Sequence, residues 1–117
     1  MSLYPTDEQV DALKAGNSND KVVMLNLLKF KNYASYAEYG KRVEAILPNY
    51  GGQVLFRGAV RSVFIGDNVP NFEAVLLGEY ANHNKFLEMT NSEEYLSLHH
   101  FREDGLESQW LLSLSTF

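Results

Sequence analysis

The chain has 117 residues, a formal net charge of −5 at pH 7 and no cysteine. This length suits one domain with one core, and we expect a single domain over residues 1–117. The negative charge, with no cluster of Lys or Arg, argues against nucleic acid or an anionic membrane as a partner. Without cysteine there is no disulfide framework, thiolate nucleophile or Cys-type metal site, which suits a reducing cytoplasm.

The sequence carries no signal for export or membrane insertion. The N-terminus lacks the basic stretch and apolar core of a signal peptide. No apolar run approaches the roughly 18 residues that a membrane span requires. We therefore expect a cytoplasmic protein with no membrane partner.

The first predicted element is a short helix that follows Thr6. The segment from Thr6 to Gln9 has the form of a capping box. Gly16 is a suitable residue to end this helix. Residues 1–20 are thus predicted to form an N-terminal helical extension.

The central predicted element is a strand over residues 22–30, with the sequence Val-Val-Met-Leu-Asn-Leu-Leu-Lys-Phe. An apolar run that opens on β-branched residues is typical of a strand buried on both faces. Asn26 shares one strand face with Met24 and Phe30. A buried amide is costly unless it is hydrogen-bonded. Asn26 therefore requires a partner, either a fixed protein group or a molecule in a cavity.

The rest of the chain alternates between helical and extended patterns. Apolar residues spaced by three and four predict a helix over 33–47, which Pro48 ends. The later elements are predicted in this order: a strand over 53–65 with a bulge at Gly58, a loop over 66–70, a strand over 72–80, a helix from 81, a helical segment from 91 or 92 to about 105, and a strand over 108–117.

This order, one helix and then β-α-β-β-α-β, predicts an α+β fold of the ferredoxin-like, split βαβ kind. Two helices cover one face of such a four-stranded sheet and leave the other face bare. A chain this apolar must cover the second face. Pairing two such faces in a symmetric homodimer is the simple solution.

Several motifs resemble the DUF1330 family. They are residues 23–30, Tyr36, Tyr39-Gly40, Gly51-Gly52, Gly58 and residues 92–95. The resemblance implies a dimeric α/β barrel, in which two sheets close into a shared barrel. Proteins with this fold include cofactor-independent monooxygenases, haem-degrading monooxygenases, haem proteins similar to chlorite dismutase, muconolactone isomerases and plain ligand binders, so the resemblance does not select an activity.

The last helical segment carries the sharpest candidate residues. Tyr95, His99 and Arg102 are four and three residues apart, which places them on one helix face. In haem-degrading proteins of this fold, an asparagine on the first strand acts with a histidine in this helix and a tryptophan before it. Asn26 and His99 match two of these positions, but Met89 stands in place of the tryptophan. The alternative for His99 is a partly exposed histidine that bonds a carboxylate such as Glu103.

Two further strands carry charged candidates. Arg57 and Arg61 lie four residues apart on one strand face and can bind a carboxylate-bearing ligand, or pair with acids such as Glu73 or Glu79. Glu79 can serve as a general base if it is desolvated. His83 and His100 are expected at the surface. No metal site is expected, because adjacent histidines on a helix diverge and no His-x-x-x-His pair is present.

The sequence supports two main hypotheses of function. The first is a cofactor-free enzyme of the monooxygenase or isomerase kind, acting on a small apolar or aromatic molecule in the barrel cavity through Asn26, His99 and Tyr39. The second is a non-enzymatic dimeric module that binds a metabolite or is merely packed. Haem degradation is a third alternative. The candidate ligand-binding residues are Met24, Phe30, Arg57, Glu79, Tyr95 and Arg102.

Overall fold

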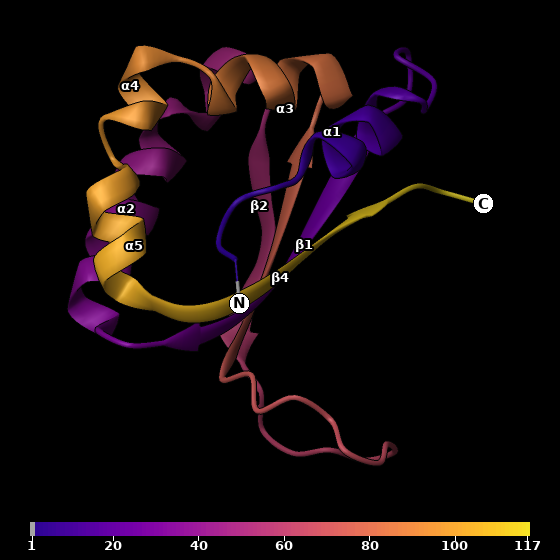
Figure 1. Ribbon diagram of the computed structural model, residues 1–117. Helices are drawn as coiled ribbons and strands as arrows, with labels where there is room; N and C mark the ends of the chain where they lie inside the picture. The colour runs from indigo at the N-terminus through magenta and orange to yellow at the C-terminus, as the bar shows by residue number, and fades with distance from the viewer. Residues whose placement is uncertain (1) are drawn as a thin grey trace.

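A computed structural model describes residues 2–117 and contains one four-stranded sheet with the strand order β2-β3-β1-β4. The strands are β1 (Val22–Phe30), β2 (Gln53–Ala59), β3 (Ala74–Tyr80) and β4 (Leu106–Leu114). β1 lies in the middle and pairs antiparallel with β3 and β4, while β2 pairs antiparallel with β3 (Figure 1). This is the ferredoxin-like topology that the order of elements predicted.

The helices are α1 (Asp7–Lys14), α2 (Tyr33–Ile46), the 3₁₀ helix η1 (Leu47–Tyr50), α3 (His83–Thr90), α4 (Glu93–Leu96) and α5 (His99–Gly105). Helices α2, α4 and α5 lie together on one side of the sheet (Figure 1). The predicted N-terminal helix is confirmed, and Thr6 and Gln9 form its capping box. None of the helices in residues 2–117 is long and apolar enough to cross a membrane.

Several predicted boundaries are wrong: β3 begins two residues later than predicted, and β4 begins two residues and ends three residues earlier. β2 ends at Ala59 rather than at residue 65, and residues 60–73 form a long loop that projects beyond the sheet (Figure 1). The physical reason is that β3 begins only at Ala74, so the residues after Ala59 have no neighbouring strand to pair with. The predicted helical segment from 92 to 105 consists of two short helices, because the helix is interrupted between Leu96 and His99.

The two faces of the sheet differ in their environment. The face toward the helices, which we call the inner face, carries Met24 and Leu28 of β1 and is well buried. The outer face carries Val23, Leu25 and Leu27, which are only partly buried within one chain. β1 was predicted to be buried on both faces. Within one chain, only its inner face is well buried.

The corner between α5 and β4 packs tightly against the start of α2. A Cβ added at Gly105 would lie 2.6 Å from the backbone nitrogen of Tyr36, so only glycine fits there. The carbonyl oxygen of Gly105 also accepts hydrogen bonds from the backbone nitrogens of Lys31 and Asn32. This contact fixes α5 over the inner face and so places the side chains of α5 above β1.

Candidate functional site

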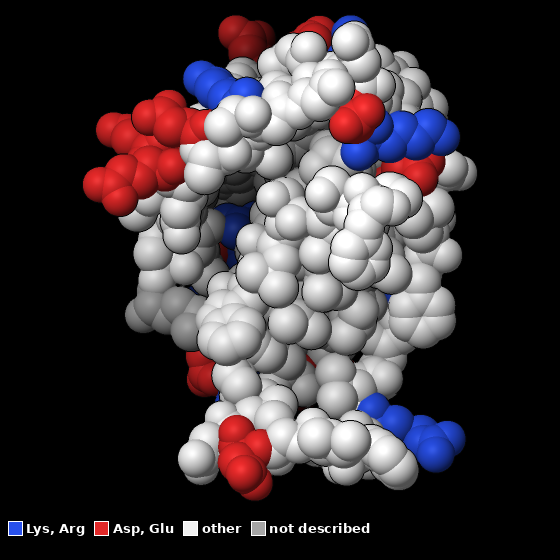
Figure 2. All heavy atoms as spheres, turned by 90° about the vertical axis from the view of Figure 1, so that its right-hand side faces the viewer, with Lys and Arg blue, Asp and Glu red and all other residues white. Residues whose placement is uncertain are grey.

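A hollow of about 1870 Å³ lies between the inner face of the sheet and the helices. Its lining comes from all four strands, from helices α2, α3, α4 and α5, and from the N-terminal segment with α1. A methyl group added at Gly40 of α2 would meet no atom within 4 Å, because the glycine borders this space. The surface of the molecule is visibly hollowed on one side, and basic atoms lie inside that recess (Figure 2). The hollow thus lies within one chain, between its sheet and its helices.

A chain of hydrogen bonds between side chains crosses the hollow from α5 to β1. Nη2 of Arg102 donates to Oε1 of Gln109 over 2.6 Å, and Nε2 of Gln109 donates to Oδ1 of Asn26 over 2.8 Å. Gln109 lies on β4 opposite Leu28 of β1, which places its side chain on the inner face beside Asn26. These hydrogen bonds therefore join the last helix, the last strand and the first strand at one polar centre.

Asn26 is held entirely by the protein. Its Nδ2 donates to the carbonyl oxygens of Leu76 at 3.2 Å and Met24 at 3.4 Å, while its Oδ1 accepts from Gln109. Both donors are used, so the amide has no free proton with which to orient a substrate oxygen. Of the two alternatives for Asn26, the geometry supports a fixed protein partner, and Asn26 positions Gln109.

Arg102 is the first donor in this series of hydrogen bonds, and it is a buried cation, only 8% exposed. Besides Gln109, its Nη2 donates to the carbonyl oxygen of Leu3 over 2.5 Å, which ties the N-terminal segment to α5. The ring of Tyr4 covers the guanidinium with its centroid 5.3 Å from Cζ. Among residues 2–117, no carboxylate lies within 4.0 Å of its nitrogens to form an ion pair.

His99 lies one turn before Arg102 and also lines the hollow. Its ring packs against Tyr95 at 5.2 Å and Tyr4 at 5.4 Å between centroids. Partial burial and the charge of Arg102 lower the pKa of His99 below the usual histidine value, with Glu103 opposing the shift. The imidazole is therefore mostly neutral near pH 7, when it can accept a proton. In the described chain His99 makes no hydrogen bond to Glu103.

The hydroxyls of Tyr39 and Tyr95 lie 2.6 Å apart in the wall of the hollow. Burial raises the pKa of Tyr39 well above the usual tyrosine value, and the neighbouring Tyr95 and Tyr36 add to the shift. The Tyr39 phenol therefore stays protonated and can donate a hydrogen bond. Tyr39, Tyr95, His99 and Arg102 meet in the hollow although they belong to three different helices.

Met24 and Phe30 lie on the inner face as predicted, and both line the hollow. Met24 is buried in its floor, while Phe30 packs on Tyr33 and Tyr36 at one end of β1. These residues supply apolar surface.

Arg57 lies at the exposed rim of the hollow. Its Nη2 pairs with Oε1 of Glu44 on α2 at 2.6 Å, rather than with Glu73 or Glu79 as the alternative reading predicted. Arg61 falls in the loop after β2, so the predicted pair of arginines on one strand face does not form.

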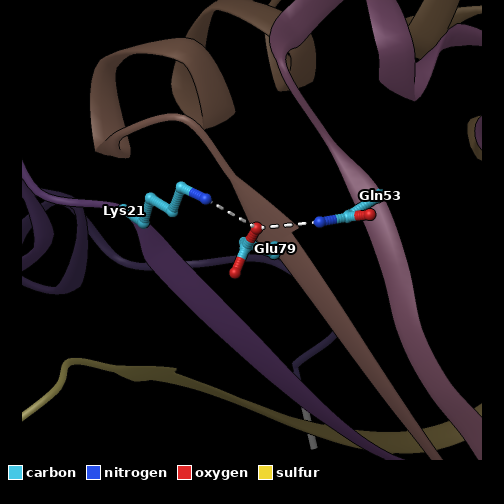
Figure 3. Close-up of polar contacts among 3 residues, drawn as sticks. All are labelled: Lys21, Gln53 and Glu79. Atoms are coloured by element: carbon cyan, nitrogen blue, oxygen red, sulfur yellow. Dashed lines mark hydrogen bonds and ion pairs between the residues drawn. The ribbon is translucent and has the colours of Figure 1, made fainter.

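Glu79 lies on the outer face, opposite Val23 of β1 and away from the hollow. Its carboxylate accepts hydrogen bonds from Gln53 at 3.0 Å and Lys21 at 3.4 Å (Figure 3). The bond from Gln53, supported by the charge of Lys21, lowers the pKa of Glu79. Glu79 is therefore ionised near pH 7 and lies outside the hollow, so it is not placed to act as a general base on a molecule bound there.

The residues present do not fit haem degradation. The amide of Asn26 is fully used by the protein. Met89, which stands where the tryptophan of the haem-degrading proteins is expected, is 2% exposed and packed in the core.

Three residues that contact Arg102 were not predicted from the sequence: Gln109, Leu3 and Tyr4. Gln109 was detectable as a polar residue in an apolar strand, by the same argument that singled out Asn26. Nothing in the sequence indicates that the N-terminal segment reaches Arg102. His83 is buried rather than at the surface, whereas His100 is exposed as predicted.

The fold of this chain is similar to that of several solved structures. A protein of unknown function from Rhodopseudomonas palustris has a TM-score of 0.87 at 23% identity, over 98% of this chain and 96% of that chain. A hydroxynitrile lyase from Passiflora edulis has a TM-score of 0.63 at 12% identity, over 85% and 95% of the two chains. SnoaB, a cofactor-independent oxygenase from Streptomyces nogalater, has a TM-score of 0.57 at 13% identity, over 84% and 96%.

These structural likenesses show a shared fold, and that fold carries both a lyase and an oxygenase. No curated protein matches the chain. The model of the family described as a domain of unknown function, DUF1330, matches residues 21–113, which span all four strands except the last residue of β4. The chain therefore belongs to the DUF1330 family.

Proposed function

We propose that the protein binds a small, largely apolar or aromatic molecule in the hollow between the inner face and the helices. The observation that carries this proposal is a connected polar centre, Arg102–Gln109–Asn26, inside a hollow lined mainly by apolar and aromatic side chains. Small-molecule sites usually combine an apolar wall with a few fixed polar groups. The volume of the hollow leaves room for such a molecule beside Met24, Tyr39 and Tyr95.

The same arrangement supports a cofactor-independent reaction of the monooxygenase or isomerase kind. In this scheme neutral His99 accepts a proton from the bound molecule, and the Tyr39 phenol donates a hydrogen bond to its oxygen. Asn26 acts through Gln109 as a positioning residue. The cofactor-independent oxygenase from Streptomyces nogalater shows that the fold is compatible with such chemistry.

The alternative is a binding module without a reaction. The complete hydrogen bonding of Asn26 favours it, because the amide then has no free donor for catalysis. The two alternatives differ in the effect of His99→Gln. An enzyme would lose turnover and keep binding, whereas a binding module would show no turnover in either form.

Binding is tested by nitrogen–proton NMR spectra of the protein titrated with a panel of small neutral and acidic aromatic compounds. We expect amide shifts at Met24, Tyr95 and Gln109. Gly40→Leu fills the open space beside α2 and serves as the blocked variant, in which these shifts should disappear. No compound shifting the inner-face residues, or equal shifts in Gly40→Leu, would contradict the proposal.

We further propose that the protein is a homodimer through the outer face of the sheet. This face carries the large apolar side chains Phe56, Trp110 and Leu112, which are 57%, 43% and 44% exposed within one chain. Seen from the side opposite α2, α4 and α5, the middle of the surface is almost free of charged atoms (Figure 2). An apolar sheet face of this kind is typical of an interface between two protein copies.

A further inference from the structure

We propose that the molecule bound in the hollow carries an acidic group, and that Arg102 is the residue that binds it. The ligand class is a small aromatic or apolar carboxylate, or a compound with an equivalent anionic oxygen. This inference rests on the proposed binding function and specifies its ligand.

Arg102 has no acidic partner among the described residues. Arg102 is the one buried charged side chain among the described residues that line the hollow. Its hydrogen-bond partners are the oxygens of Leu3 and Gln109, which are neutral. Burying a charge without an opposite charge is costly, so a buried cation normally has an acidic partner. Within residues 2–117 that partner is absent, and a bound anion would supply it.

Two nitrogens of the Arg102 guanidinium remain free to donate hydrogen bonds in residues 2–117. Both hydrogen bonds use Nη2, so Nε and Nη1 have no partner in residues 2–117. No side-chain nitrogen in this part of the chain is both fully buried and unpartnered, so these two atoms are accessible. Because Arg102 lines the hollow, they are available to a molecule inside it. A guanidinium in a fixed position binds a carboxylate with good geometry and strength.

The Arg102 guanidinium is already held in place by the protein. Gln109 and the Leu3 carbonyl fix Nη2, and the Tyr4 ring covers one side of the group. Gln109 is itself held by Asn26 on β1. A ligand would therefore meet an ordered cation, and little conformational freedom would be lost on binding.

The surroundings then define the rest of the ligand. The side chains near this cation include Tyr36, Tyr39 and Tyr95, and burial keeps the phenols of Tyr36 and Tyr39 protonated. The other charged residues that line the hollow, such as Glu44, Arg57 and Glu73, are exposed at its rim. One acidic group on an otherwise apolar body matches this distribution of charge.

The test compares two probes that differ only in charge, 2-naphthoate and 2-naphthamide, by titration calorimetry on the full chain. We expect the wild-type protein to prefer the acid by about tenfold or more. Arg102→Gln should remove the preference, and Arg102→Lys should keep part of it. Arg42→Gln is the matched control, because Arg42 is an exposed arginine of α2 paired with Glu38.

A second measurement does not depend on how well the variants fold. In wild-type protein the Nε–H resonance of Arg102 should shift with 2-naphthoate and stay in place with 2-naphthamide. Equal affinity of both probes, or a preference that Arg102→Gln retains, would overturn the role of Arg102 while leaving the binding function intact. If neither probe nor any compound of the NMR panel binds, the proposed function fails and this inference fails with it.

Discussion

Arg102 and Gln109 are joined by a hydrogen bond of 2.6 Å that links α5 to β4 inside the hollow. Gln109 also donates a hydrogen bond to Asn26, and Arg102 also donates one to the carbonyl oxygen of Leu3. Four separate parts of the chain thus meet at one polar centre: the N-terminal segment, β1, α5 and β4. The following predictions depend on this arrangement and on the way the fold supports it.

Asn26→Ala should lower the free energy of unfolding by about 1–3 kcal/mol, because it removes the amide that accepts from Nε2 of Gln109 and donates to the Leu76 carbonyl. Urea unfolding measures the change. Asn84→Ala is the control, since Asn84 is exposed on α3 and should change stability by no more than about 0.5 kcal/mol. An Asn26→Ala protein as stable as the control would show that the amide faces an open cavity after all.

His99 should titrate below the usual histidine pKa of about 6.5. Its neutral form is favoured in the folded protein, so its contribution to stability is complete above pH 6.5. That contribution is lost as the pH falls below 6.5, because the unfolded chain then takes up the proton more readily. The groups that face it are Arg102, Glu103, Tyr4 and Tyr95.

Proton NMR of the His99 ring across a pH series measures this pKa. Arg102→Gln removes one of the two causes that lower it, so the pKa should rise in that variant, whereas Arg102→Lys should leave it nearly unchanged. A His99 pKa above 6.5 in the wild-type protein would contradict the assigned environment.

Gly105→Ala should destabilise the fold by about 1–3 kcal/mol, because the new methyl group would clash with the backbone of Tyr36. Gly40→Ala is the matched glycine control within α2. There the methyl group meets open space, and replacing a glycine inside a helix should stabilise the protein by about 0.5–1 kcal/mol. Thermal unfolding of both variants should therefore show shifts of opposite sign. Equal shifts would mean that the corner at Gly105 is less tightly packed than described.

The proposed homodimer should be visible by sedimentation at micromolar concentration. Leu112→Glu places a charge on the outer face and should yield a monomer, because burying an unpaired charge at the interface is costly. Leu96→Glu, on the helical side at 45% exposure, should remain dimeric. A wild-type protein that sediments as a monomer would rule out the paired sheets.

Much of the fold follows from local sequence patterns. The capping box at Thr6, the apolar β1 and the order of elements predicted the ferredoxin-like topology, which the strand order confirms. The end of β2 was placed too late because the residues after Ala59 have a strand-like composition. A strand also needs a neighbour, and β3 begins only at Ala74. That requirement depends on another part of the chain and is invisible in the composition of residues 60–65.

The site was predictable in part. Helical spacing brought Tyr95, His99 and Arg102 together correctly, even though the helix is interrupted between them. The argument that a buried amide needs a partner was also right for Asn26, but the partner is Gln109, far along the chain in β4. The strand face of Glu79 was not predicted, because alternation along a strand separates two faces without saying which one the helices cover. Only the paired register places Glu79 on the outer face.

The most direct test of the binding site is a crystal structure of the protein grown with saturating 2-naphthoate. We expect the naphthalene ring to lie between the inner face and the helices, with the carboxylate against Nε and Nη1 of Arg102. Two results would contradict the proposed site: electron density for the ligand on the outer face, or a hollow without ligand density although the ligand concentration is saturating.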